Sequence, residues 1–382
     1  YTEDAVRGPS AGGSGQDNVY HFDGVNVNLP LFGTLSAEPS SHDIEQVAVV
    51  KGGANATDFN RAAGIMVNTV SRSGTNAFRG AISYQLQSEN FIAERETTSA
   101  SVFEEDKDWL VGNIGGPILK DRLFFYTSYY SPTSERQNRA NLYGEVPDFK
   151  STRDEFFGKL TYSPTDSILL NGSFRTSDRE ERHYGVGGEA YSGTTSSGSE
   201  SEQNIAILEA SWIINDRSFA TFKFTDFENP TAGRPDNVLG LMPALDGSVN
   251  IDPNALDQMG FVTIPVPVAG QTAFNTFIAP IIDRYGYLQD GVKKGGGRVG
   301  AGSQFDNDDF FRQSFQVGYD LSLGNKVTHD LHIGYQWSKD QEDLYRTSNG
   351  WGSVTVPGGR LNCPTNSTCA GKPSYYQAQV QQ

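Results

Sequence analysis

Apolar and polar residues alternate with a period of two along most of the chain from Phe78 onward. In Phe311–Leu323 every odd position except Gln313 is apolar or aromatic, whereas the even positions are polar or glycine. Leu331–Ser338 and Ile168–Arg175 follow the same pattern. Such alternation indicates β-strands with one apolar and one polar face. The predicted strands are Phe78–Phe91, Asp106–Leu119, Arg122–Arg139, Thr152–Pro164, Ser167–His183, Ser201–Asn215, Arg217–Asn229, Asp308–Gly324 and Lys326–Arg346.

The connections between these strands alternate in length. The short ones are Lys120–Asp121, Pro164–Asp166, Asp216 and Asn325, and the long ones span about 92–105, 140–151, 184–200 and 230–307. Short turns at one rim and long loops at the other are typical of bacterial outer-membrane barrels. A soluble β-sandwich has the same strand period but no reason to sort its connections in this way. The pattern therefore predicts a mainly β protein with a transmembrane antiparallel β-barrel.

A smaller domain precedes the first barrel strand. Val19–Val27, Ile44–Gly52 and Gly64–Ser73 each carry β-branched or aromatic residues bounded by turn formers, and they are predicted to be strands of one small sheet. We expect residues 1–77 to form a mixed α/β plug domain inside the barrel lumen, because a wide barrel without a plug would leak. Residues 78–382 would then be barrel, with a long extracellular loop at 230–307.

The loop at 230–307 has a pattern of its own. Its apolar residues fall on one helical face: Phe274, Phe277, Ile278, Ile281, Ile282, Tyr285 and Leu288. Pro280 lies within this stretch and is expected to kink or split the helix. Two interpretations stay open, a loop with a small core of its own and a lid over the pore that faces a ligand.

Composition is compatible with the barrel. Only 36% of the 382 residues are hydrophobic, although 12% are aromatic, which suits a wall with one apolar face and one wet face. No run of about 18 apolar residues occurs, so a transmembrane helix is excluded. The formal net charge of −16 argues against a nucleic-acid partner, because such partners select a basic surface.

Both ends of the chain and its two cysteines add expectations. Tyr1 is not an initiator methionine and the final residues QAQVQQ form no closing strand, so we expect a fragment of a longer protein. Cys363 and Cys369 lie six residues apart in a segment rich in glycine, proline and asparagine. They are either a short disulfide loop formed in an oxidising compartment or two free thiols.

The sequence motifs that would indicate cofactor binding, metal binding or catalysis are weak. Gly295–Gly300 matches a dinucleotide-binding spacing but belongs to no β-α-β unit. The acidic run Asp306–Asp309 offers oxygen ligands for Ca²⁺ or is a solvated loop end. No catalytic triad or paired metal motif is present in the sequence, so we predict no enzyme activity, no metal and no cofactor.

Four segments carry a resemblance to a known family. FDGVNV (Phe22–Val27), IEQVAVVKGG (Ile44–Gly53), Phe59–Gly80 and GGPILKDRLFFYTSYY (Gly115–Tyr130) together resemble the plug and first barrel hairpin of TonB-dependent outer-membrane transporters, most closely their Oar-like branch. The similarity covers about residues 19–130. The family has Tyr-Gly-Arg where this chain has Phe59-Asn60-Arg61, which leaves Arg61 in register.

The resemblance implies a location, a fold and partners. It implies the outer membrane of a Gram-negative bacterium and a barrel of about 22 strands when complete, of which roughly nine are present here. It also implies three partners: outer-membrane lipid, an extracellular ligand, and the TonB complex of the inner membrane, which would act through a segment that lies before Tyr1.

Charged plug residues are candidates for the contact with the barrel. We expect Lys51, Arg61 and Arg72 to face wall acids such as Glu209 or Asp320, with ordinary solvated charges as the alternative. Aromatic residues near strand ends are expected to form the girdle at the membrane interface rather than a binding platform. These aromatic residues are Phe124, Phe125, Tyr129, Tyr130, Trp212 and Trp337.

Three functions follow in order of preference. The first is a TonB-dependent transporter that takes up, or exports, a large ligand through a plugged barrel. The second is a surface adhesin or assembly protein that uses the barrel as an anchor and the loop at 230–307 as its contact surface. The third, a secreted all-β hydrolase, requires converging carboxylates or a triad that the sequence does not offer.

Overall fold

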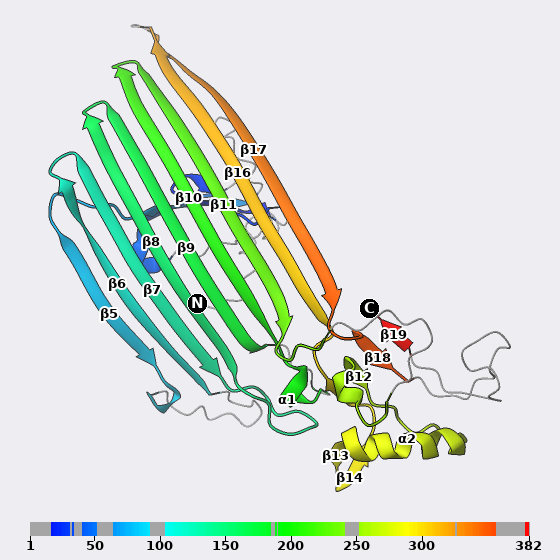
Figure 1. The fold of residues 1–382 in the computed structure, drawn as a ribbon. Coiled ribbons are helices and arrows are strands. Elements are labelled where there is room, and N and C mark those ends of the chain that lie inside the picture. Colours follow the sequence, from blue (N-terminus) through cyan, green and yellow to red (C-terminus); the bar gives the residue numbers. More distant parts are fainter. Residues whose placement is uncertain are drawn as a thin grey trace.

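The computed structural model describes residues 17–30, 33, 40–51, 64–91, 104–184, 188, 190–240, 252–324, 327–356 and 379–381. Three parts are seen in Figure 1: a large curved sheet, a small sheet on its inner side, and a group of short elements at one end of the large sheet. We call these parts the wall, the plug sheet and the cap.

The wall is one antiparallel sheet of nine strands. Its strands are β5 (Arg79–Gln87), β6 (Glu105–Leu119), β7 (Leu123–Arg136), β8 (Phe149–Thr165), β9 (Ile168–Tyr184), β10 (Ser197–Asn215), β11 (Ser218–Pro235), β16 (Gln304–Leu323) and β17 (His329–Ser348). All nine predicted strands are therefore confirmed. Neighbours in sequence are neighbours in the sheet, and among the described residues β5 and β17 are its two open edges.

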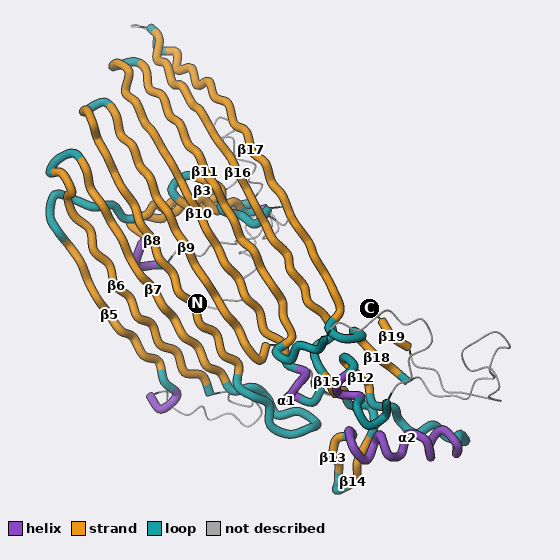
Figure 2. Tube along the Cα trace, viewed as in Figure 1, coloured by secondary structure: helices purple, strands orange, loops and turns teal. Residues whose placement is uncertain are grey.

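The plug sheet has four strands in the order β2-β1-β4-β3. These are β1 (Val19–Phe22), β2 (Val25–Asn26), β3 (Ile44–Lys51), which follows a short 3-10 helix at Ser41–Asp43, and β4 (Ile65–Ser71). The single strand predicted at Val19–Val27 is instead a hairpin. Asp23 and Gly24 have φ values of 49° and 75°, and two successive positive φ angles reverse the chain in a two-residue turn. The strands of this sheet run across those of the wall (Figure 2).

Side-chain alternation gives the wall two distinct faces. In β10, Ile205 and Ile207 are almost completely buried on the inner side, whereas Leu208 and Trp212 are half exposed on the outer side. In β8 the burial alternates residue by residue from Ser151 to Leu160. The odd positions of β8 face the plug sheet and the even positions face outward.

Apolar outward positions form a band of limited height. On β10 they run from Ala206 to Ile214, which at ~3.4 Å per residue and a tilt of about 40° corresponds to a height of about 21 Å. Beyond this band the outward positions become charged, as at Asp154, Glu202 and Glu228. The band is close to the ~25 Å that a barrel presents to hydrocarbon.

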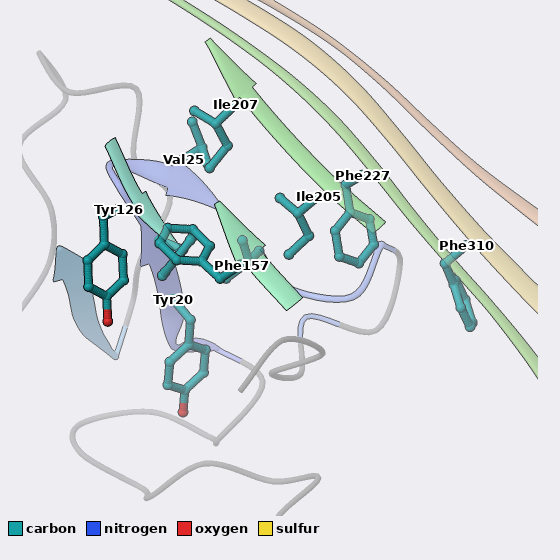
Figure 3. Packing of buried hydrophobic residues seen from close by; sticks show 10 residues of the cluster. Tyr20, Val25, Tyr126, Phe157, Ile205, Ile207, Phe227 and Phe310 are labelled. Carbon is teal, nitrogen blue, oxygen red and sulfur yellow. The ribbon is translucent and has the colours of Figure 1, made fainter. Parts of the chain in front are cut away.

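The core lies between the plug sheet and the wall (Figure 3). The plug sheet contributes Tyr20, Phe22, Val25 and Val27, and the wall contributes Tyr126, Phe157, Ile205, Ile207, Phe227 and Phe310. The Phe22 and Phe157 rings meet edge to face with centroids 5.8 Å apart. Phe78, just before β5, packs at a ring distance of 6.3 Å on Phe125.

The cap is built from the long connections. It contains α1 (Ser192–Thr195), a 3-10 helix at Leu256–Gln258, β12 (Phe261–Thr263), α2 (Thr272–Tyr285), β13 (Tyr287–Gln289), β14 (Val292–Lys294), β15 (Arg298–Gly300), β18 (Ser353–Thr355) and β19 (Gln379–Gln381). Another 3-10 helix, Glu89–Phe91, follows β5. Since β11 and β16 extend to Pro235 and Gln304, the connection between them is shorter than the expected 230–307. Within the described ranges no helix is long and apolar enough to cross a membrane.

Pro280 does not split the predicted helix, which runs unbroken as α2. Phe274 and Ile278 before the proline, and Ile281 and Tyr285 after it, are all buried. Both halves are held against the interior of the cap, and this packing compensates for the hydrogen bond that a proline removes.

A charge on the outer face of β10 tests the membrane band. We expect Leu208→Arg to lower the free energy of unfolding by about 2–4 kcal/mol, because arginine near the middle of the bilayer loses its hydration. Urea unfolding of the vesicle-inserted protein, followed by tryptophan fluorescence, measures this. Asn204→Arg, four residues along the same face but outside the band, is the matched control and should cost less than about 1 kcal/mol. Equal effects of the two variants would contradict this placement of the band.

Candidate functional site

The tip of the β1–β2 hairpin touches the inner face of the wall. A Cβ atom placed on Gly24 would lie 2.3 Å from Nζ of Lys223 on β11, so a side chain at this position would displace the flexible end of that lysine. The positive φ of Gly24 adds a second reason for glycine. The hairpin thus places a turn with two positive φ angles against the charged side chain of Lys223.

A buried ion pair fixes this hairpin to β8. Nζ of Lys159 lies 3.4 Å from Oδ2 of Asp23, and both side chains are 8% exposed. Lys159 also donates to Oγ of Ser71 at 2.8 Å. Ser71 in turn donates to Asp23 through its hydroxyl at 2.5 Å and through its backbone N–H at 2.8 Å. The carboxylate is therefore oriented by its own sheet before it meets the wall.

A second contact joins the end of the hairpin to β16. The guanidinium of Arg312 donates to the backbone oxygen of Asn28 at 2.9 Å and to Oδ1 of Asn26 at 3.1 Å. Its Nε pairs with Asp340 on β17 at 2.7 Å. Asp340 thus holds the arginine in the orientation that binds the plug sheet.

The third contact involves Asp43, at the end of the 3-10 helix before β3. Its Oδ1 accepts a hydrogen bond of 2.9 Å from the hydroxyl of Tyr126. Burial raises the pKa of the Asp43 carboxyl above its usual value, against the opposing effect of hydrogen bonds from Ser128 and Tyr126. His42 beside it lies with its ring 6.1 Å from that of Tyr130.

Next to Asp43 the inner wall carries a buried charged cluster. Glu155 on β8 pairs with Arg153 on the same strand and with Arg175 on β9, where the Nη2 to Oε2 distance is 2.7 Å. Arg175 also donates to Gln203, and Nε of Arg153 donates to Ser177 at 3.0 Å. Both arginines pair with one carboxylate of the wall, so the cluster keeps one net positive charge and Glu155 is satisfied without the plug sheet.

Of the three plug residues predicted to face wall acids, Lys51 and Arg72 are described by the structure and Arg61 is not. Lys51 is exposed at the end of β3, and Arg72 is exposed with its Nε donating to the oxygen of Ile44. The two wall acids are occupied by neighbours on the wall itself. Glu209 pairs with Lys223 at 3.3 Å, and Asp320 pairs with His332 at 2.6 Å.

Arg61 lies outside the described residues, as do Cys363 and Cys369. The contact of Arg61 with the wall and the disulfide between the cysteines therefore stay predictions.

Most residues of the observed contact are not among those predicted from the sequence. One signal for them exists, because Phe157, Ile205, Ile207, Phe227 and Phe310 are apolar residues at positions where the strand alternation calls for polar ones. All five belong to the one core cluster that the wall shares with the plug sheet. Their charged neighbours, such as Lys159 and Arg312, stand in the polar register like any lumen residue and carry no such signal.

The aromatic girdle is smaller than expected. Tyr130 faces the plug sheet, where Cζ of Arg153 lies 5.9 Å from its ring centroid, so it does not contact lipid. Phe124 has the same parity on β7 as Tyr126 and belongs to the inner face. Trp212 and Tyr129 are exposed on the outer face, and Trp337 stacks on Phe315 at 5.7 Å.

The cap joins loops from several hairpins at the opposite rim from the short turns. Tyr143, from the β7–β8 connection, contacts the rings of Tyr191 and Tyr287 and donates to the oxygen of Tyr285 at 3.0 Å. The cap has its own hydrophobic core, as expected if the long connection is a loop with a small core of its own. Its members are Leu256, Met259, Val262, Ile264, Ile281, Tyr285, Val299, Trp351 and Val354.

Asn349 fastens the cap to the wall. It is fully buried at the end of β17, and its side-chain amide donates to the oxygens of Asn237 and Gly302 at 2.9 and 2.8 Å. Its Oδ1 accepts from the backbone N–H of Leu239 at 2.7 Å. One side chain thus ties together the chain leaving β11, the chain entering β16 and the end of β17.

The acidic run Asp306–Asp309 is only partly paired, because Oδ1 of Asp308 is buried without a hydrogen-bond partner in the described part of the chain. Asp306 pairs with Arg346 at 2.6 Å, and across the described ranges no group of three or more His, Cys, Asp or Glu residues is arranged to hold a metal ion.

Comparisons with known proteins agree with this geometry. Residues 70–148 match the family described as an outer membrane beta barrel domain. Over 143 residues the chain is 26% identical to the TonB-dependent transporter Oar of Myxococcus xanthus, a match that covers 34% of this chain and 13% of Oar.

Solved structures share the fold. The outer membrane transporter YddB of Escherichia coli matches with a TM-score of 0.61 and 10% identity over 97% of this chain and 46% of YddB. The ferripyoverdine receptor of the Pseudomonas aeruginosa outer membrane matches with a TM-score of 0.52 and 11% identity, over 98% of this chain and 42% of the receptor. The chain thus spans less than half the length of these proteins.

The expected resemblance is confirmed: the chain is similar in sequence to the TonB-dependent transporter Oar, has the fold of outer-membrane transporters and receptors, and is a β-barrel protein of the Gram-negative outer membrane.

Proposed function

We propose that this chain is part of a TonB-dependent transporter that moves a large ligand through a barrel closed by the plug sheet. The observation that carries the proposal is the docking of a separately folded sheet on the inner face of the wall. The named function of Oar and the fold shared with YddB support it. The TonB complex would be its partner at the inner membrane, and outer-membrane lipid would surround the wall.

The contact is arranged so that most charges keep a partner when the plug sheet leaves. Asp23 retains both hydrogen bonds from Ser71, and Arg312 retains Asp340. Glu155 retains its two arginines on the wall. An unpaired buried charge is the main cost of breaking such contacts, so release into a wet lumen is reversible.

The cap lies at the rim where a ligand from outside would arrive, since long loops of outer-membrane barrels are extracellular. Because Tyr143 and Asn349 join several loops into one body, ligand contact at one loop would reach the others. We infer that the cap receives the ligand before the plug sheet is displaced.

Uptake that depends on energy tests the transporter against the adhesin alternative. Cells that produce the intact protein are given labelled siderophores, oligosaccharides and peptides, with and without an uncoupler of the proton gradient. A transporter accumulates one of these classes only in energised cells. Surface binding that is unchanged by the uncoupler, without any accumulation, would instead favour an adhesin.

Loss of the Lys159 ammonium should weaken the closure of the barrel. We expect Lys159→Met to destabilise the docked plug sheet by about 1.5–3 kcal/mol, because a charged hydrogen-bond donor to Ser71 and Asp23 is removed. The measurement is ion conductance across planar bilayers at increasing urea, where the onset should shift to lower urea. Lys150→Met, on the outward face of the same strand, is the matched control. An unshifted onset in Lys159→Met would remove the ion pair from this role.

Asp43 predicts a pH dependence of docking. Its pKa is raised in the docked state, so that state binds the proton more tightly than the released state does. Docking should therefore weaken as the pH rises from the ordinary value of 3.8 through the raised pKa, and the penalty persists at neutral pH. Asp43→Asn should remove this dependence and dock more firmly than the unmodified protein at about pH 7.

The same conductance measurement at acid and neutral pH checks the prediction for Asp43. Asp216→Asn, at an exposed short turn, serves as the control. Firmer docking of the unmodified protein at neutral than at acid pH would contradict it.

A further inference from the structure

An apolar groove opens on the outer face of the wall, across β8 to β11. It has a volume of about 460 Å³ and is lined mainly by apolar side chains. Six of the residues that line it form its centre: Leu160, Leu170, Gly172, Leu208, Ala210 and Phe222. Four of these, the two small residues excepted, are more than one third exposed.

The groove results from two small residues among large ones. Gly172 on β9 lies in register between Leu160 and Leu208, and Ala210 on β10 lies between Leu170 and Phe222. The small residues leave a floor, and their large neighbours rise as walls on both sides. A linear hydrocarbon in such a groove contacts protein on several sides, which multiplies dispersion contacts over those of a flat surface.

The groove lies close to the short-turn rim. Leu123 and Tyr162, which also line it, are cross-strand partners directly beside the turns at 120–122 and 164–167. Short turns of bacterial outer-membrane barrels face the periplasm, so the groove opens to the inner leaflet, which consists of phospholipid.

A fixed cation stands at the periplasmic end of the groove. Arg122 precedes Leu123, and its guanidinium donates to the oxygen of Pro164 at 2.7 Å while its backbone oxygen accepts from Ser163. The side chain remains 44% exposed, and Asp166, at 4.0 Å, is fully exposed to solvent. The guanidinium is therefore oriented but still available to an anion at the level of the headgroups.

We propose that this groove binds one phospholipid of the inner leaflet, with an acyl chain between Leu160, Leu170 and Leu208 and the phosphate near Arg122. The apolar lining matches the chain and the arginine matches the phosphate. The proposal rests on placement in the outer membrane and not on transport, so it stands or falls separately from the proposed function.

Retention of lipid through purification tests the proposal. The intact protein is reconstituted in vesicles of phosphatidylethanolamine and phosphatidylglycerol, transferred to detergent, and its bound phospholipid is counted by native mass spectrometry. We expect one retained phospholipid per protein. Gly172→Leu, which fills the floor of the groove, should weaken retention about tenfold, equal to ~1.4 kcal/mol.

Gly158→Leu is the matched control, since Gly158 lies on the same outward face of the neighbouring strand β8 but does not line the groove. A Cβ at either glycine would first meet a side-chain carbon at 3.4 Å, so the two substitutions are sterically alike. Retention in Gly158→Leu should equal that of the unmodified protein. Equal loss in both variants, or no loss in Gly172→Leu, would overturn the proposal.

Two further variants keep the result decisive. Ala210→Ile fills the groove from β10 and should also release the lipid if Gly172→Leu does not fold, as judged by electrophoretic mobility with and without heating. Arg122→Gln removes the cation placed against the phosphate and should also weaken retention of the lipid. If Ala210→Ile retains as much phospholipid as the unmodified protein, the groove is not the binding site.

Discussion

Apolar contact between the β1–β2 hairpin and the inner wall is the interaction on which the arrangement depends. Burying a large apolar side chain contributes about 1.5–3 kcal/mol, so the five wall residues Phe157, Ile205, Ile207, Phe227 and Phe310 together represent on the order of 10 kcal/mol as an upper estimate. A buried ion pair such as Asp23–Lys159 contributes little net stability, because both charges lose their hydration, although removing one partner is costly because the other charge stays buried without its counterion. The apolar contact therefore supplies most of the affinity between the plug sheet and the wall. Spontaneous release would be rare, which fits a plug displaced by an external energy source.

The polar contacts have a different part in the same interface. Asp23, Asn26 and Asp43 meet Lys159, Arg312 and Tyr126, three wall residues on three different strands. Hydrogen bonds of fixed geometry at three separate points define one position of the plug sheet, whereas an apolar surface alone would permit sliding. Since each group must be satisfied when buried, any shift of the sheet leaves one of them without a partner.

The sequence was sufficient for the wall and insufficient for the contact. Strand period and loop alternation predicted all nine wall strands, because a wall between hydrocarbon and water imposes opposite demands on successive side chains. The predicted strand Val19–Val27 is a hairpin, because Asp23 and Gly24 form a two-residue turn within the apolar run. Only their charge marks Lys51 and Arg72 as candidates for the contact. Charge does not reveal which edge of a small sheet faces the wall, and both residues are exposed in the structure.

Exceptions to the alternation carried more information than the alternation itself. Ile207 and Ile213 on β10 both interrupt the polar register, and sequence alone gives no reason to treat them differently. Ile207 is 3% exposed because it lies at the height of the plug sheet, whereas Ile213, near the short turn, is 53% exposed. An apolar residue in the polar register is therefore buried only where a second body reaches it. Because Phe157 and Phe227 are such residues on neighbouring parts of the wall, their positions along the strands trace the footprint of the plug sheet. Apolar residues in the polar register, and not the sign of any single charge, are therefore the sequence signal for where the plug sheet contacts the wall.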